Sequence, residues 1–157
     1  MTDYNVSWVM PANAPGEQDV LTLDDLWQGC LLLARSPETF TSAISKCDIE
    51  DDDGNTLIRT LYFSERPQAM LKQTICLSPG VKFECQSDTG NKVTTMVLGG
   101  LSGSSDDAYL SIEYAIPSAN MKPDPESAKQ SFAAKAKENL VDGLKTMREL
   151  KAQGKLG

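Results

Sequence analysis

The chain has 157 residues, of which 40% are hydrophobic, and it carries a formal net charge of -7. The acidic balance argues against a nucleic acid partner and against anionic membrane surfaces, because both bind basic patches. The length and the apolar content are typical of one folded domain, spanning residues 1–157, that buries a sizeable core.

The sequence contains no histidine, and none of its four cysteines, Cys30, Cys47, Cys76 and Cys85, lies in a CxxC pair. These features argue against a zinc site and exclude Ser-His and Cys-His catalytic pairs. Any acid–base chemistry must use other side chains or bound water, so we expect neither a metal nor a cofactor. The first residues lack the pattern of a signal peptide and no run is long enough to cross a bilayer, so we expect a soluble, cytoplasmic protein.

The hydrophobic pattern predicts one strand, two short helices, six further strands and a long helix, in that order. Thr22, with Asp25 three residues later, gives the first helix a capping box. Ser36 and Pro37 end that helix and begin the second. Turn residues such as Asp53-Gly54-Asn55 separate the later strands at the short spacing of an antiparallel meander. The expected ranges are residues 4–10 (strand), 23–34 and 38–43 (helices), 47–52, 56–64, 68–77, 81–87, 92–98 and 108–116 (strands), and 124–154 (long helix with its caps).

The long helix organises the expected fold. Asp124 and Pro125 begin it, Gly154 ends it, and its apolar stripe follows the helical period. Because a helix of this kind, roughly 40 Å long, is not stable alone in water, the stripe needs a large apolar surface. We expect that surface to be a curved antiparallel sheet of about seven strands, which gives an α+β fold with a hollow between helix and sheet. The stripe consists of Phe132, Ala136, Leu140, Leu144, Met147 and Leu150, widened by Ala133, Val141 and Gly143.

Several short segments carry a resemblance to a known family. They are Leu21-Thr22-Leu23 with Trp27-Gln28-Gly29, Ala34-Arg35-Ser36-Pro37, Asp53-Gly54-Asn55-Thr56 with Arg59, and Met147-Arg148-Glu149-Leu150. In their order and spacing the chain resembles the AtaL-like family of the SRPBCC superfamily, the START/Bet v 1-like helix-grip proteins. The resemblance implies a site for a hydrophobic small molecule between helix and sheet, relatives that are cofactor-free cyclases, aromatases or isomerases, and a place in microbial, often fungal, secondary metabolism. Members of the family often carry an acidic residue on the fourth strand, where this chain has Gln73.

Strand alternation indicates which side chains face the hollow. Arg59 on the third strand and Gln73 on the fourth fall on mostly apolar faces, and across the Pro-Gly turn we expect Leu77 beside Val81 and Gln73 beside Cys85. The alternative for the apolar members is that they form a plain hydrophobic core. The residues expected to line a ligand are Trp27, Leu61, Phe63, Ile75, Phe83, Cys85, Thr95, Val97, Ile112, Phe132, Ala136 and Leu140.

Three polar residues on these faces, Arg59, Gln73 and Tyr114, are the candidates for catalysis. A buried guanidinium needs a partner, so Arg59 is either an anchor for a ligand carboxylate, phenolate or enolate, or a solvated rim residue paired with an acid. Gln73 and Tyr114, with Thr95, either orient a ligand or belong to an internal hydrogen-bond network. The acidic run at 48–53 lacks the EF-hand spacing of a calcium site, and we interpret it as a solvated hairpin tip.

Three functions are compatible with this pattern and with what the resemblance implies. The first is a cofactor-free enzyme of secondary metabolism that binds an apolar, conjugated intermediate and promotes its cyclisation, isomerisation or dehydration. Its catalysis would come from holding one conformer and stabilising negative charge. The second is a carrier or protector of a hydrophobic small molecule, and the third is a partner-binding domain with a filled interior. The pattern is compatible with a monomer or a homodimer.

Overall fold

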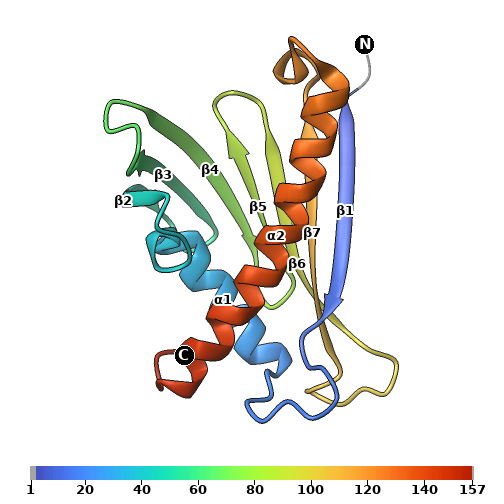
Figure 1. Ribbon diagram of the computed structural model, residues 1–157. Helices are drawn as coiled ribbons and strands as arrows, with labels where there is room; N and C mark the ends of the chain where they lie inside the picture. Colours follow the sequence, from blue (N-terminus) through green and yellow to red (C-terminus); the bar gives the residue numbers. More distant parts are fainter. Residues whose placement is uncertain (1–2, 157) are drawn as a thin grey trace.

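One antiparallel sheet of seven strands organises the protein, whose structure, a computed structural model, describes residues 3–156 (Figure 1). The strand order β1-β7-β6-β5-β4-β3-β2 confirms the predicted meander, with the first strand added beside the last. Residues 1–2 and 157, at the ends of the predicted domain, lie outside the described residues. The strands are β1 (Tyr4–Pro11), β2 (Ile44–Asp52), β3 (Thr56–Phe63), β4 (Met70–Ser78), β5 (Lys82–Ser87), β6 (Lys92–Gly99) and β7 (Ala108–Ile116). The helices are α1 (Leu23–Arg35) and α2 (Pro125–Ala152), with short 3-10 turns at Pro37–Thr39 and Ser118–Met121.

Both long helices have the caps that the sequence predicts. The Thr22 hydroxyl accepts the Asp25 amide at 3.1 Å, and the Asp25 carboxylate accepts the Thr22 amide at 2.9 Å, so the capping box of α1 is confirmed. At the end of α2, Gly154 has a φ of 69° and the Lys155 amide donates to the Leu150 carbonyl at 2.8 Å. Such a left-handed cap favours glycine, which has no Cβ to clash. Within the described residues, no helix combines the length and apolar character needed to span a membrane.

The prediction of a second short helix over residues 38–43 is wrong. The chain makes only a single 3-10 turn, Pro37–Thr39, and β2 then begins earlier than expected. The Thr41 hydroxyl accepts the Ala43 amide at 3.2 Å, and the Ala43 carbonyl accepts the Ser64 amide at 3.0 Å. These side-chain and inter-strand hydrogen bonds occupy backbone groups that a longer helix needs for its own ladder.

Helix α2 lies against β1 and β7 and then crosses α1 (Figure 1). Phe132 is half-buried and Val141 is 42% exposed, so the stripe is narrower than expected. At the crossing, a Cβ placed on Gly29 would lie 2.6 Å from side-chain atoms of Met147, so a glycine is what allows the two helices to approach so closely. The fully buried members of the stripe are Ala136, Leu140, Leu144, Met147 and Leu150.

The hairpin between β4 and β5 differs from the predicted pairing by two residues. The turn is closed by an amide-to-carbonyl hydrogen bond of 2.9 Å, and Gly80 has a φ of 77°, as in a type II turn. Leu77 is therefore not beside Val81, and Gln73 is not beside Cys85. Because the shift is an even number of residues, each side chain keeps its predicted face. The observed pairs are Leu77–Phe83, Ile75–Cys85 and Gln73–Ser87.

One edge of the sheet is formed by β2, which carries the acidic run. Its pairing with β3 is interrupted at two places, between Ile44 and Lys46 and between Ile49 and Asp51. Over the described part of the chain, no three or more His, Cys, Asp or Glu side chains are grouped so as to hold a metal ion. Ion pairs on and beside this edge are Lys46–Asp48, Lys72–Glu50 and Arg35–Asp52.

Candidate functional site

Arg59 lies on β3, on the face of the sheet that contacts α1, and is only 6% exposed. Its Nε donates to Gln73 Oε1 at 2.8 Å, and its Nη1 donates to the carbonyls of Leu33 at 3.0 Å and Ala34 at 2.6 Å. These carbonyls belong to the last turn of α1, where helical carbonyls have no partner within the helix. The guanidinium therefore satisfies the end of α1 and ties it to the sheet.

Gln73 and Ser87 continue this hydrogen-bonded chain across two further strands. The Nε2 of Gln73 donates to Ser87 Oγ at 3.2 Å, and Nη2 of Arg59 lies 3.9 Å from Cys85 Sγ. We call Arg59, Gln73, Cys85 and Ser87 the polar cluster; all four are buried. Burial raises the pKa of the Cys85 thiol, and the nearby Arg59 only partly offsets this rise, so the thiol is protonated at neutral pH.

The positive charge of Arg59 has no carboxylate partner within residues 3–156. Its burial also excludes the alternative of a solvated rim residue paired with an acid. The positive charge of Arg59 is balanced in part by the carboxyl-terminal end of α1, which carries about half a negative charge. A guanidinium has five N–H donors, and in the described structure the two on Nη2 meet only the Cys85 thiol. A donor on Nη2 is thus free for a further acceptor.

Tyr114, the third catalytic candidate, lies in a different place. It is on β7, 5% exposed, and its hydroxyl accepts a hydrogen bond of 2.6 Å from Asn139 of α2. Its ring makes an edge-to-face contact with Phe132, with the ring centroids 6.4 Å apart. Burial raises the pKa of Tyr114, and the Asn139 hydrogen bond opposes the rise. Three strands separate β7 from β3, so Tyr114 is about 19 Å from Arg59 measured along the sheet.

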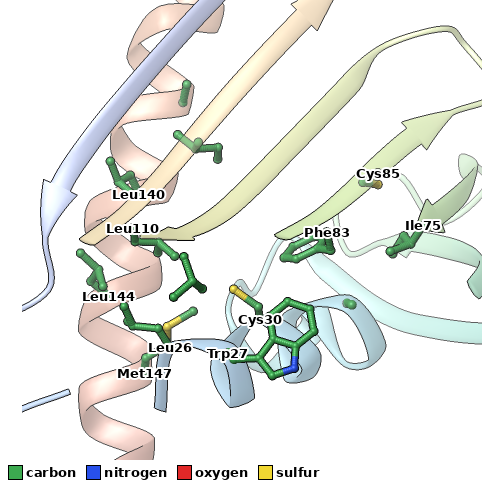
Figure 2. Packing of buried hydrophobic residues seen from close by; sticks show 14 of the residues in the cluster. Leu26, Trp27, Cys30, Ile75, Phe83, Cys85, Leu110, Leu140, Leu144 and Met147 are labelled. Atoms are coloured by element: carbon green, nitrogen blue, oxygen red, sulfur yellow. The ribbon is translucent and has the colours of Figure 1, made fainter. Parts of the chain in front are cut away.

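Most of the predicted ligand-lining residues are packed in the core. Figure 2 shows Phe83 close to Trp27 of α1, and Leu140 of α2 beside Leu110, while Cys85 and Ile75 lie farther from α2. The half-buried ones are Phe63 and Phe132. The buried ones are Trp27, Leu61, Ile75, Phe83, Cys85, Thr95, Val97, Ile112, Ala136 and Leu140. The part of the concave face next to α1 and α2 is therefore filled by the protein's own side chains, and the polar cluster adjoins this packing through Cys85, beside the last turn of α1.

Two residues of the candidate site were missed by reasoning from the sequence. Ser87 continues the inward alternation of Phe83 and Cys85, and that pattern was the signal available for it. Asn139 lies on the polar side of the α2 stripe, and no sequence signal connects it to Tyr114.

Two open depressions lie elsewhere on the surface, and neither contains a predicted site residue. One, of about 540 Å³, lies at the turn between β3 and β4, around residues 66–69. The other, of about 340 Å³, lies between α1 and the residues that follow α2, beside Lys155 and Leu156.

Several solved structures resemble this fold. StfQ, described as a di-domain ARO/CYC from the steffimycin biosynthetic pathway, matches with a TM-score of 0.70 and 10% identity, over 94% of this chain and 50% of its own. This chain therefore spans half the length of that protein. Ara h 8.0201 matches with a TM-score of 0.61 and 9% identity, over 92% of this chain and 96% of its own. The Zhui aromatase/cyclase from Streptomyces sp. R1128 matches with a TM-score of 0.59 and 10% identity, over 94% and 91%.

At these identities the matches show the fold alone, and they confirm the predicted helix-grip architecture. No curated protein matches the sequence. The model of one protein family, AtaL, described as acetylaranotin biosynthesis cluster protein L, matches residues 6–154. Since this match spans nearly the whole chain, the protein belongs to the AtaL family.

Proposed function

We propose that this protein binds an apolar, conjugated small molecule against the concave face of its sheet and promotes its cyclisation, isomerisation or dehydration without a cofactor. The description of the family names a biosynthesis cluster, and two of the similar structures are described as aromatase/cyclases. The observation that carries the proposal is the polar cluster. It presents a buried cation with an unused donor on an otherwise apolar surface, without an acid to neutralise it.

Such a donor stabilises negative charge that develops on a ligand oxygen. In a ring closure, the ligand first loses a proton to solvent to give an enolate, whose carbon then attacks a carbonyl carbon; the new C–C bond forms as the C=O π bond breaks, and the oxygen carries the negative charge until solvent water protonates it on release. A fixed N–H of Arg59 near that oxygen lowers the barrier, because the surroundings exclude water and the donor needs no reorganisation. Gln73 keeps the guanidinium in place through the 2.8 Å hydrogen bond to Nε. Arg59 therefore stabilises the negative charge of the ligand, and Gln73 holds Arg59 in position. Neither residue transfers a proton.

The apolar part of the ligand would lie on the half-buried side chains around the cluster. Leu71 and Phe63 lie on β4 and β3 and Val93 lies on β6, while Phe132 of α2 lies beside Tyr114. Aromatic and branched aliphatic walls of this kind suit a flat, conjugated molecule. Tyr114, on the Phe132 side, would contact the far end of a long ligand.

A carrier or protector is the second candidate, and one observation favours it. The polar cluster contains no carboxylate, the Cys85 thiol is protonated, and an amide such as that of Gln73 cannot act as a base. A ligand that must lose a proton to the protein would therefore be bound and shielded but not converted.

The test is incubation of the purified protein with a panel of poly-β-carbonyl and polyunsaturated ring precursors, with products followed by mass spectrometry. Arg59→Lys keeps the charge but loses the forked donor, and the rate is expected to fall about a hundredfold, the usual cost of one lost oxyanion donor. Arg35→Lys, on the exposed side of the same helix end, is the matched control and should keep the rate. Tight binding without any product supports the carrier, and absence of binding by every compound refutes both functions.

A further inference from the structure

The charge balance around the polar cluster indicates the charge of its ligand. Arg59 brings a full positive charge, and the residue opposite it on β2 is the apolar Ile49. The nearest acids of β2 and β5, Glu50 and Glu84, point to the outer face of the sheet, where each is paired with lysine. Glu38, on the 3-10 turn after α1, also lies close enough to influence Cys47 beside Arg59, but it makes no ion pair with Arg59 in the described residues. The positive charge of Arg59 is therefore balanced only in part, mainly by the last turn of α1, in a low-dielectric environment.

Gln73 is the residue that leaves this charge without a carboxylate partner. Its Oε1 accepts from Arg59 at 2.8 Å, and its Nε2 lies 3.2 Å from the Ser87 hydroxyl. A glutamate has the same shape, and its two oxygens would accept from Arg59 and from Ser87, because a hydroxyl donates as readily as it accepts. Every hydrogen bond of the cluster would be kept with a carboxylate at this position. The amide therefore differs from a carboxylate in charge alone.

We infer that the site takes a ligand with one negative charge on an apolar ring system, a carboxylate, phenolate or enolate, and that Gln73 determines this selectivity. The inference rests on the proposed function, since it takes the concave face as the ligand site. The anion is met by the free N–H of Arg59 Nη2 in a charge-assisted hydrogen bond, which is stronger than a neutral one. A neutral ligand of the same shape gains only the apolar contacts.

Two fluorescent probes that differ only in charge test this inference. Anilinonaphthalene sulfonate is an anion on an apolar ring system, and N-phenylnaphthylamine is its neutral counterpart. The wild-type protein is expected to bind the anion about tenfold more tightly, at one site per chain by calorimetry, because a hydrogen bond to a charged group is worth this much. Gln73→Glu is expected to remove the preference and to leave the affinity for the neutral probe within about twofold. Gln86→Glu adds the same charge to the exposed face of β5 and should change neither affinity.

The outcomes separate the inference from the proposed function. Binding of both probes with equal affinity overturns the charge selectivity and leaves an apolar site standing, whereas binding of neither overturns both. A preference that survives in Gln73→Glu overturns the role of Gln73. Thermal unfolding of Gln73→Glu is expected at or above the wild-type temperature, because the new carboxylate pairs with Arg59. If that variant does not fold, the wild-type preference between the two probes decides the charge of the ligand.

Discussion

Arg59 is a permanent charge held away from water by carbonyl oxygens instead of by a carboxylate. The two carbonyls come from α1, some 25 residues earlier in the chain, so the same side chain joins a helix end to the sheet. Its role in the fold and its proposed role at a ligand are therefore compatible, since they use different nitrogens of one guanidinium.

Replacement of this residue tests its contribution to the fold. Arg59→Met is expected to lower the free energy of unfolding by about 2–3 kcal/mol, because the end of α1 and the amide of Gln73 lose a charged donor. Urea unfolding measures the change. Arg35→Met, which breaks the partly exposed pair with Asp52, is the control and should cost less than about 1 kcal/mol. Equal losses in the two variants would show that Arg59 does not hold α1.

The shifted pKa of Tyr114 predicts a dependence of stability on pH. Burial raises this pKa, so above the ordinary value of 10.0 the unfolded chain releases the phenol proton more readily than the folded protein. The contribution of Tyr114 to the free energy of unfolding is complete below that pH and is lost as the pH rises above it. Unfolding by urea at a series of alkaline pH values should show a shallower decline for Tyr114→Phe than for the wild type. Parallel curves would contradict the prediction.

Strand alternation was enough to place Arg59, Gln73 and Tyr114 on the inner face, because a side chain's face depends only on the parity of its position. The partners of these residues were not predictable in the same way. The carbonyls bonded to Arg59 and the amide bonded to Tyr114 belong to helices, whose height over the sheet depends on packing of the whole core.

At the level of elements, α2 is stable because its stripe is buried against β1, β7 and α1. Leu140→Ala is expected to lower the free energy of unfolding by about 2–5 kcal/mol, since the leucine is 3% exposed and its loss leaves a cavity. The neighbouring Val141→Ala, at a side chain that is 42% exposed, should cost less than about 0.5 kcal/mol. Thermal or chemical unfolding of the pair measures both, and similar costs would mean that the face of α2 is assigned wrongly.

The elements that the sequence predicted well are those with a strong period or an explicit cap. The capping box at Thr22 appears as expected, and the stripe of α2 is buried from Ala136 to Leu150 although it is narrower than expected. The errors arose in short segments. The pairing of β4 with β5 across the Pro-Gly turn differs from the prediction by two residues, and after the 3-10 turn at Pro37 a hydrogen bond to the Thr41 hydroxyl is found where a short helix was predicted. In such segments a few local hydrogen bonds decide the conformation, and hydrophobic periodicity carries no information about them.

At the scale of the whole molecule, one asparagine joins three distant segments. Asn13 donates to the Leu21 and Asp106 carbonyls at 2.8 and 2.9 Å, and it accepts the Leu21 amide at 2.8 Å. Arg148 of α2 approaches the same side chain and donates to the Asp19 carbonyl at 2.5 Å. The loop before α1, the loop before β7 and the end of α2 are thus held together at one end of the sheet.

Loss of this side chain should loosen all three segments at once. Asn13→Ala is expected to lower the free energy of unfolding by about 2–3 kcal/mol, because three hydrogen bonds are lost and buried backbone groups remain. For a chain of this size the loss corresponds to a fall of roughly 5–10 °C in the unfolding temperature, measurable by calorimetry. Asn5→Ala, at an exposed position of β1, serves as the control. An unfolding temperature of Asn13→Ala within about 2 °C of the wild type would contradict this reading.

The irregular edge formed by β2 has a consequence beyond the single molecule. An extended strand at the border of a sheet is a template on which a second polypeptide can add, and such addition begins fibril growth. Here the template is interrupted at two places and is lined with carboxylates. An incoming chain finds neither a continuous row of free amides and carbonyls nor a neutral surface. Edge-to-edge joining of two sheets through β2 is therefore disfavoured.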